Sequence, residues 1–142
     1  MEEKGRLDQV TRRITGAAIE VHKTLEPGLL ESAYQACLAF ELRESGFTVE
    51  EQKPLPVVYK KMQLDCGYRM DLLVENEIVV EIKAIEQLAP IHHAQLLSHL
   101  RLSGKRVGLL INFHVRVLKN KLRRIVNEFP DSAISACSAV NQ

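Results

Sequence analysis

Residues 68–84 read YRMDLLVENEIVVEIKA and contain two runs rich in Leu, Val and Ile. Such runs favour buried β-strands, and the polar triplet between them predicts a hairpin turn. With Asn76 at the centre of the turn, the numbers of paired residues sum to 152, which places Asp71 opposite Glu81. Lys83 follows Glu81 by two residues and therefore shares its face of the strand. The stretch predicts a sheet that carries two acids and a lysine on one face.

This arrangement is costly unless the charges have a partner. Carboxylates directly opposite each other lie about 5 Å apart at Cβ and repel, and buried charges need compensation. A divalent cation between Asp71 and Glu81 would relieve the repulsion, so the pattern predicts a metal site beside Lys83. Two alternatives stay open. A turn of even length would put the carboxylates on opposite faces, and an edge strand would make Glu81 and Lys83 a solvated stripe, with Asp71 paired to Arg69 or Lys83.

Length and composition indicate one globular domain. The 142 residues predict a single domain 1–142, with a core over about 7–129 and a flexible tail over 130–142. The sequence starts without an apolar leader, and no run approaches the length needed to span a bilayer. The three cysteines are odd in number and lack metal-type spacing, so we expect reduced thiols and a cytoplasmic location away from membranes.

The charge is divided unevenly along the chain. Residues 1–86 hold 16 acids and 11 Lys or Arg (−5), whereas residues 87–142 hold 2 acids and 8 bases (+6). The eight bases are Arg101, Lys105, Arg106, Arg116, Lys119, Lys121, Arg123 and Arg124. A basic half of this kind can hold a phosphate backbone, although solubility and charge at helix C-termini also explain it. With 5% aromatic residues and no Trp, little base-stacking surface is expected.

The order of elements predicts an α/β (α+β) fold with a central mixed β-sheet flanked by helices. Besides the hairpin, the patterns predict helices over about 7–25, 29–45, 90–103 and 115–128, and strands over about 47–51, 55–60 and 106–112. Gly46 and Gly104 stand where a C-cap favours glycine. Phosphate-binding loops, dinucleotide fingerprints and serine-hydrolase elbows are absent from the sequence.

Three further residue groups are candidates for the site. Glu31 and Tyr34 share a helix face, and Glu31 can supply a third carboxylate or be an exposed first-turn acid favoured by the helix dipole. Gln95 lies on the helix after the Glu-x-Lys strand, where its amide can orient a water or phosphate oxygen or face solvent. His92, His93 and His99 lack the spacing of helical zinc ligands, so structural zinc is disfavoured.

Several of these blocks resemble a known family. Residues 28–34, GLLESAY, reproduce the Gly-x-x-Glu-x-x-Tyr motif of the GxxExxY proteins. Asp71, the Glu-x-Lys strand, residues 93–97 (HAQLL) and residues 108–113 (GLLINF) are similar to the family's other blocks, in the same order over about residues 8–129. The family is placed with the PD-(D/E)xK nuclease-like superfamily. The resemblance implies a restriction-endonuclease-like core.

The resemblance also implies a Mg²⁺ or Mn²⁺ site. Asp71 and Glu81 would bind the metal, with the backbone carbonyl of Ile82 as a further ligand. Glu31 resembles the first-helix acid that binds the metal directly or through water. Lys83 would position or help deprotonate the attacking water and stabilise the pentacovalent phosphate.

Other positions match the family less closely. Gln95 resembles the glutamine of recombination-nuclease-like members, and Tyr34 would support the site by packing behind Glu31 or bonding to it. Met70 stands where the superfamily's name has proline. His99 stands where many relatives have tyrosine, four residues after the glutamine, and is assigned a supporting place.

Together these observations predict a Mg²⁺- or Mn²⁺-dependent phosphodiesterase that hydrolyses nucleic acid with a metal-activated water. The basic residues would hold the backbone, while DNA or RNA is left undetermined. The alternatives are an inactive nucleic-acid-binding or adaptor module, a metal-dependent hydrolase of a small nucleotide-like phosphate, and a subunit that functions only in a complex. The sequence also leaves open whether the chain forms a homo-oligomer.

Overall fold

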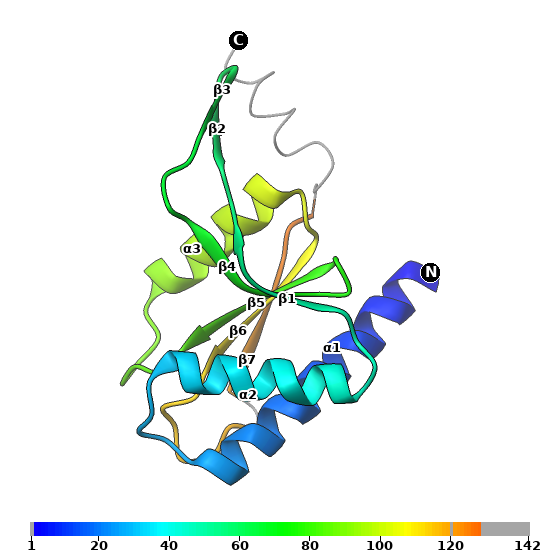
Figure 1. Ribbon diagram of the computed structural model, residues 1–142, viewed down its shortest axis with the longest axis vertical. Coiled ribbons are helices and arrows are strands. Elements are labelled where there is room, and N and C mark those ends of the chain that lie inside the picture. The colour runs from blue at the N-terminus through cyan, green and yellow to red at the C-terminus, as the bar shows by residue number, and fades with distance from the viewer. Residues whose placement is uncertain (1, 120, 129–142) are drawn as a thin grey trace.

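The computed structural model describes residues 2–119 and 121–128; the tail expected over 130–142 lies outside them. A five-stranded mixed sheet lies between helices on both faces, which confirms the predicted α/β architecture and is consistent with a restriction-endonuclease-like core (Figure 1). The helices are α1 (Glu2–Leu25), α2 (Glu31–Glu44) and α3 (Pro90–Ser103). The strands are β1 (Val49–Pro54), β2 (Val57–Tyr59), β3 (Met62–Leu64), β4 (Arg69–Val74), β5 (Ile78–Lys83), β6 (Val107–Asn112) and β7 (Leu122–Val126).

The strand order in the sheet is β1-β4-β5-β6-β7. β4 pairs antiparallel with β1 and β5, and β6 pairs antiparallel with β7. β5 and β6 are parallel, and α3 makes the crossover that parallel strands require. β2 and β3 form a separate antiparallel hairpin that extends away from the main sheet (Figure 1).

Alternation along β5 decides which helices cover each side chain. Val80, like its neighbours two residues away, packs in the core formed with α1 and α2. Val79 packs in the second core with Leu96 and Leu100 of α3. Glu81 and Lys83 continue the Val79 series, because successive strand residues point to opposite faces. The two charged side chains therefore lie on the α3 face of the sheet.

The prediction of a final helix over 115–128 is wrong. Residues 122–126 form β7, which pairs with β6 along Val107–Ile111. β6 is buried along its whole length, so its outer backbone groups need a hydrogen-bonded partner. The apolar spacing of Leu118, Leu122 and Ile125 suits a helix, but Ile125 also packs in the α3-side core from a strand.

Smaller boundaries also differ. α1 begins at residue 2, before the expected 7, and the strand expected over 55–60 is the shorter β2, followed by the unexpected β3. Gly46 and Gly104 have φ of 91° and 70°, consistent with the predicted helix ends. None of the helices in the described residues is both long and apolar enough to span a membrane.

Candidate active site

The β4–β5 register sets the geometry of the site. Leu72 pairs with Val80, and the pairs on the turn side of it have the same sum of residue numbers, 152. The turn reaches this register with Asn76 and the residue before it at φ of 57° and 55°, a left-handed region that Asn tolerates. The predicted register, in which the numbers of paired residues sum to 152, is confirmed. It places Asp71 and Glu81 next to each other, just beyond the last backbone pair.

Past Leu72 the two strands form a fork, in which side chains replace the backbone ladder. The Ile82 N–H donates to Asp71 Oδ2 at 2.8 Å. In return, the Asp71 N–H donates to Glu81 Oε2 at 3.3 Å. Each carboxylate thus accepts a hydrogen bond from a backbone N–H of the opposite strand. These bonds hold both acids where the two strands separate.

The fork is electrostatically strained. Burial raises the pKa of Asp71 above its ordinary value, and the charge of Glu81 raises it further. The Ile82 N–H, the Gln52 amide and the Lys83 ammonium lower this pKa in part. Glu81 itself is only 7% exposed. Two facing acids with little solvent around them would be stabilised by a cation at this position.

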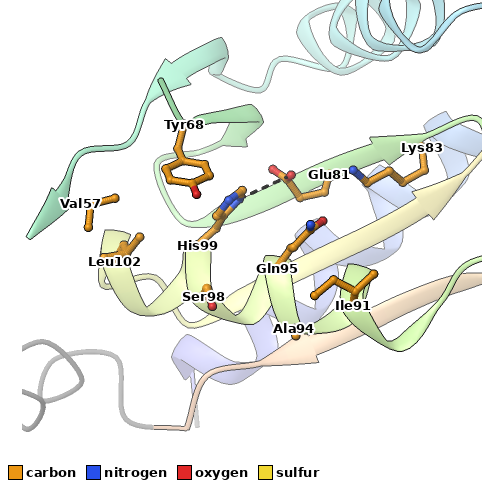
Figure 2. Close-up of a pocket in the computed structure, with 10 residues that line it drawn as sticks. All are labelled: Val57, Tyr68, Glu81, Lys83, Ile91, Ala94, Gln95, Ser98, His99 and Leu102. Carbon is orange, nitrogen blue, oxygen red and sulfur yellow. Dashed lines mark ion pairs between the residues drawn. The ribbon is translucent and has the colours of Figure 1, made fainter. Parts of the chain in front are cut away.

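A pocket of about 480 Å³ opens beside Glu81 and Lys83 on the α3 face. Figure 2 shows Gln95 and His99 reaching from α3 toward β5. They lie four residues apart and therefore share a helix face. His99 Nδ1 lies 3.5 Å from Glu81 Oε1, and Tyr68, just before β4, packs its ring against His99. The structure thus brings four of the predicted residues, Glu81, Lys83, Gln95 and His99, around one cavity.

Glu31 lies at the end of β5 and does not join the Asp71–Glu81 pair. It is the first residue of α2, and its Oε2 accepts the N–H of Ala84 at 3.1 Å. Among the described residues, no group of three or more His, Cys, Asp or Glu side chains is placed to hold a metal ion. In this arrangement Glu31 anchors the backbone directly after Lys83.

Tyr34 supports the loop that leads into α2. Its buried hydroxyl donates to the Glu26 carbonyl at 2.6 Å and accepts the Leu29 N–H at 3.1 Å. Its ring stacks on Phe113, with centroids 4.6 Å apart and planes 8° apart. Tyr34 therefore bonds to the backbone before Glu31, and its ring ties that loop to the segment after β6.

Sequence reasoning missed two amides that organise the site. Gln52, at φ 50°, donates from Nε2 to Asp71 Oδ1 at 3.1 Å and to Gln35 Oε1 at 2.6 Å. Buried Asn112 brackets Ile85, donating to its carbonyl at 2.8 Å and accepting its N–H at 3.1 Å. A polar residue closing an otherwise apolar run signals Asn112, whereas no local pattern marks Gln52.

The predicted basic residues do not form one face. Arg101, Lys105 and Arg106 precede β6, Arg116, Lys119 and Lys121 follow it, and Arg123 and Arg124 lie in β7. The first two groups are therefore at opposite ends of β6, and neighbours in β7 point to opposite faces. Arg124 pairs with Asp8 of α1 at 2.8 Å, whereas Arg123 lines a smaller cavity beside α3. The eight bases predicted to hold a phosphate backbone thus include two, Arg123 and Arg124, that point to opposite faces of the sheet.

The donor set suits a hard cation. Asp71 and Glu81 offer carboxylate oxygens, and the backbone of Ile82 lies between Glu81 and Lys83. Mg²⁺ is commonly held by one or two carboxylates and keeps several waters, so two acids and a carbonyl fit it without a third carboxylate. Burial and the charge of Glu81 raise the pKa of Asp71, and a cation between the two acids would lower it.

Comparison with known proteins agrees with this geometry. A family model described as the PD-(D/E)XK nuclease superfamily matches residues 8–125. The matched range includes Glu31, Asp71, Glu81, Lys83 and Gln95. No curated protein and no solved structure matches the chain significantly.

Proposed function

The chain belongs to the PD-(D/E)XK nuclease superfamily, and from this premise we propose that it is a Mg²⁺-dependent nuclease that hydrolyses the backbone of nucleic acid. Within the superfamily, we assign it to the GxxExxY type on its residues 28–34. The observation that carries the proposal is the fork, where Asp71 and Glu81 face each other and Lys83 lies on the same face.

Each residue at the fork would have a separate role in catalysis. Asp71, Glu81 and the Ile82 carbonyl would hold the metal, which supplies charge to polarise the phosphate and to lower the pKa of a water. Lys83 holds the attacking water and stabilises the negative charge that develops on the pentacovalent phosphate. Gln95, from α3, orients the water or a phosphate oxygen above β5.

Glu31, Asn112 and Gln52 hold the catalytic residues in position without taking part in the reaction. Glu31 binds the Ala84 N–H, and Asn112 brackets Ile85. These bonds fix the backbone on the far side of Lys83, so its ammonium group starts from a set direction. Gln52 does the same for Asp71 by binding Oδ1, which leaves the carboxylate little freedom to rotate.

One observation favours a non-enzymatic binding module. Both oxygens of Asp71 already accept hydrogen bonds, from the Ile82 N–H and the Gln52 amide. A carboxylate that serves only to cap the fork would be satisfied by these bonds. Such a module would bind nucleic acid with Glu81 replaced by Ala and would cleave none with any metal.

Calorimetric Mn²⁺ binding together with cleavage of single- and double-stranded DNA and RNA tests the proposal. We expect metal-dependent cleavage by the wild type. Lys83→Ala should keep Mn²⁺ binding and lose cleavage by about 100-fold or more, as for removal of a donor that stabilises developing charge. Asp71→Ala and Glu81→Ala should lose both, and Lys4→Ala, an exposed lysine of α1, should change neither. Absence of Mn²⁺ binding and of cleavage in the wild type would refute the proposal.

A further inference from the structure

The pocket beside Glu81 has a mixed lining. Its polar residues are Glu81, Lys83, Gln95, Ser98 and His99, and its apolar residues are Val57, Tyr68, Ile91, Ala94 and Leu102. Figure 2 shows Val57, Tyr68 and Leu102 together at one end of the pocket. A phosphate backbone alone would contact only the polar residues. The apolar end therefore suits an apolar, flat or bulky part of a ligand.

Tyr68 is the aromatic residue of this apolar end. Among the Tyr and Phe residues that the structure describes, Tyr68 is the one that lines the pocket. Its ring contacts His99 at an angle, with centroids 6.0 Å apart and planes 60° apart. The residue stays 50% exposed, so much of the ring is open to a ligand. An open tyrosine ring in a pocket that is also lined by a cationic lysine, Lys83, suits a nucleobase joined to a phosphate.

The pocket's dimensions select for an unpaired base. Its volume of about 480 Å³ is in the range of sites that enclose small ligands. A paired base is stacked inside its duplex and cannot reach a recessed wall. A base in a single strand, or one turned out of a helix, can lie against an aromatic ring while its phosphate reaches Lys83 of the same pocket.

The β2–β3 hairpin lies next to the apolar end of the pocket and carries positive charge at its tip. Val57 of β2 lines the pocket, and the hairpin continues from it to an exposed tip. The tip carries Lys60 and Lys61, with the Lys60 Nζ over the Tyr59 ring at 5.5 Å. Residues 57–64 contain no acidic side chain. A strand leaving the pocket in this direction would meet two cations complementary to its phosphates.

We infer that this pocket is a nucleotide subsite that takes one unpaired nucleotide, with its base against Tyr68 and its phosphate at Lys83. The inference rests on the proposed function and deepens it, because it names the substrate class as single-stranded or locally unpaired nucleic acid. The sugar is not discriminated by the contacts described, so DNA and RNA strands are both ligands.

The absence of Trp from the chain makes a direct test available. Tyr68→Trp places a sole indole in the pocket, and a stacked base quenches its fluorescence. In EDTA, which prevents cleavage, we expect quenching by single-stranded DNA and RNA and none by the matched blunt duplex. Phe40→Trp, on an exposed site of α2, is the control and should be quenched by neither. Equal quenching by strand and duplex, no quenching by strands, or an equal response of the control overturns the inference.

The second readout is single-strand binding by the wild type and by two variants that carry no Trp. Tyr68→Ala should weaken single-strand binding by about 10-fold, the usual loss when a stacked base loses its platform, while Tyr68→Phe keeps the ring and should restore it. An affinity unchanged by Tyr68→Ala, or no nucleic-acid binding by the wild type, overturns the inference.

The two proposals fail in different ways. Quenching of the Tyr68→Trp variant by strands, without Lys83-dependent cleavage by the wild type, supports the subsite and rejects the nuclease. Cleavage that depends on Lys83 but prefers duplex, and is unaffected by Tyr68→Ala, supports the nuclease and rejects the subsite.

Discussion

Asp71→Asn removes one of the two charges at the fork and keeps the size of the side chain. Unit charges about 5 Å apart repel by about 3 kcal/mol at an effective dielectric constant of about 20. The amide gives up part of this gain, because its one oxygen can replace only one of the two bonds that Asp71 accepts, at about 1 kcal/mol. It also loses the attraction of Lys83, worth about 1 kcal/mol more at this partly solvated site.

The variant should therefore be more stable than the wild type by about 1 kcal/mol at pH 7 without metal. For a chain of this length the midpoint of thermal unfolding should rise by about 3 °C. If the fork is a charged metal site, its two acids are expected to destabilise the protein in the absence of metal. If Asp71 only caps the fork, its carboxylate is expected to stabilise the protein.

The pH dependence follows from the raised pKa of Asp71. Between the ordinary value of about 3.9 and the raised folded value, the folded chain binds more protons at this group than the unfolded chain. Its contribution to stability therefore falls as the pH rises through this interval, and the full penalty is present above it. The advantage of Asp71→Asn should be present at neutral pH and disappear below about pH 4, where the wild-type carboxyl is protonated in both states.

Urea denaturation at several pH values, in EDTA and in Mn²⁺, measures these effects. Mn²⁺ at about 100 times its Kd should stabilise the wild type by about 2.7 kcal/mol and leave the variant unchanged. Asp65→Asn is the control, because Asp65 only accepts the Gly67 N–H at 3.0 Å in an exposed turn and should gain nothing. If Asp71→Asn is less stable than the wild type at pH 7 in EDTA, the fork is not a strained charge pair and the reasoning is refuted.

Three other substitutions test contacts away from the fork by the same denaturation assay. Gly108→Ala would place a Cβ 3.0 Å from the Leu96 side chain, so we expect a loss of about 1–3 kcal/mol from displaced packing of α3, and no loss would show that α3 can shift freely. Tyr34→Phe removes a buried hydroxyl that makes two backbone bonds and should cost about 1–3 kcal/mol; a neutral result would mean that solvent satisfies that loop. Glu77→Gln breaks an exposed ion pair with Arg6 and should cost at most about 1 kcal/mol. Arg6 lowers the pKa of Glu77, so this stability is present above the ordinary glutamate pKa and lost as the pH falls through the lowered value; a difference that persists in acid would contradict it.

The hairpin at 68–84 shows how far local rules reach. Its register was predicted from two apolar runs and the turn between them, because a shift by one residue would turn Leu72 and Val80 out of the core. The placement of Lys83 beside Glu81 follows from the two-residue period of a strand alone. The fork at Asp71 could be predicted only in part. Pairing rules put the two acids opposite each other, but only the structure shows that the strands separate there and that the carboxylates accept hydrogen bonds from backbone N–H groups.

The last segment shows where local rules fail. Leu118, Leu122 and Ile125 follow a helical spacing, but the exposed backbone edge of β6 needs a partner, and β7 supplies it. This need arises only after β5, α3 and β6 have assembled, so no window of the sequence contains it. The opposite orientations of Arg123 and Arg124 also lie beyond local rules, because a charge count carries no information about the two faces of β7.

The amino-acid sequence by itself therefore determined the hairpin, its register, the helix ends at glycine and the shared face of Glu81 and Lys83. Each depends on residues within about ten positions of one another. The tertiary structure alone decided which helix covers that face, that Gln52 fixes Asp71 and that Tyr68 forms a wall across from Gln95. These contacts join segments that are far apart in the sequence, and they form because the sheet must bury both faces and pair its backbone edges at once.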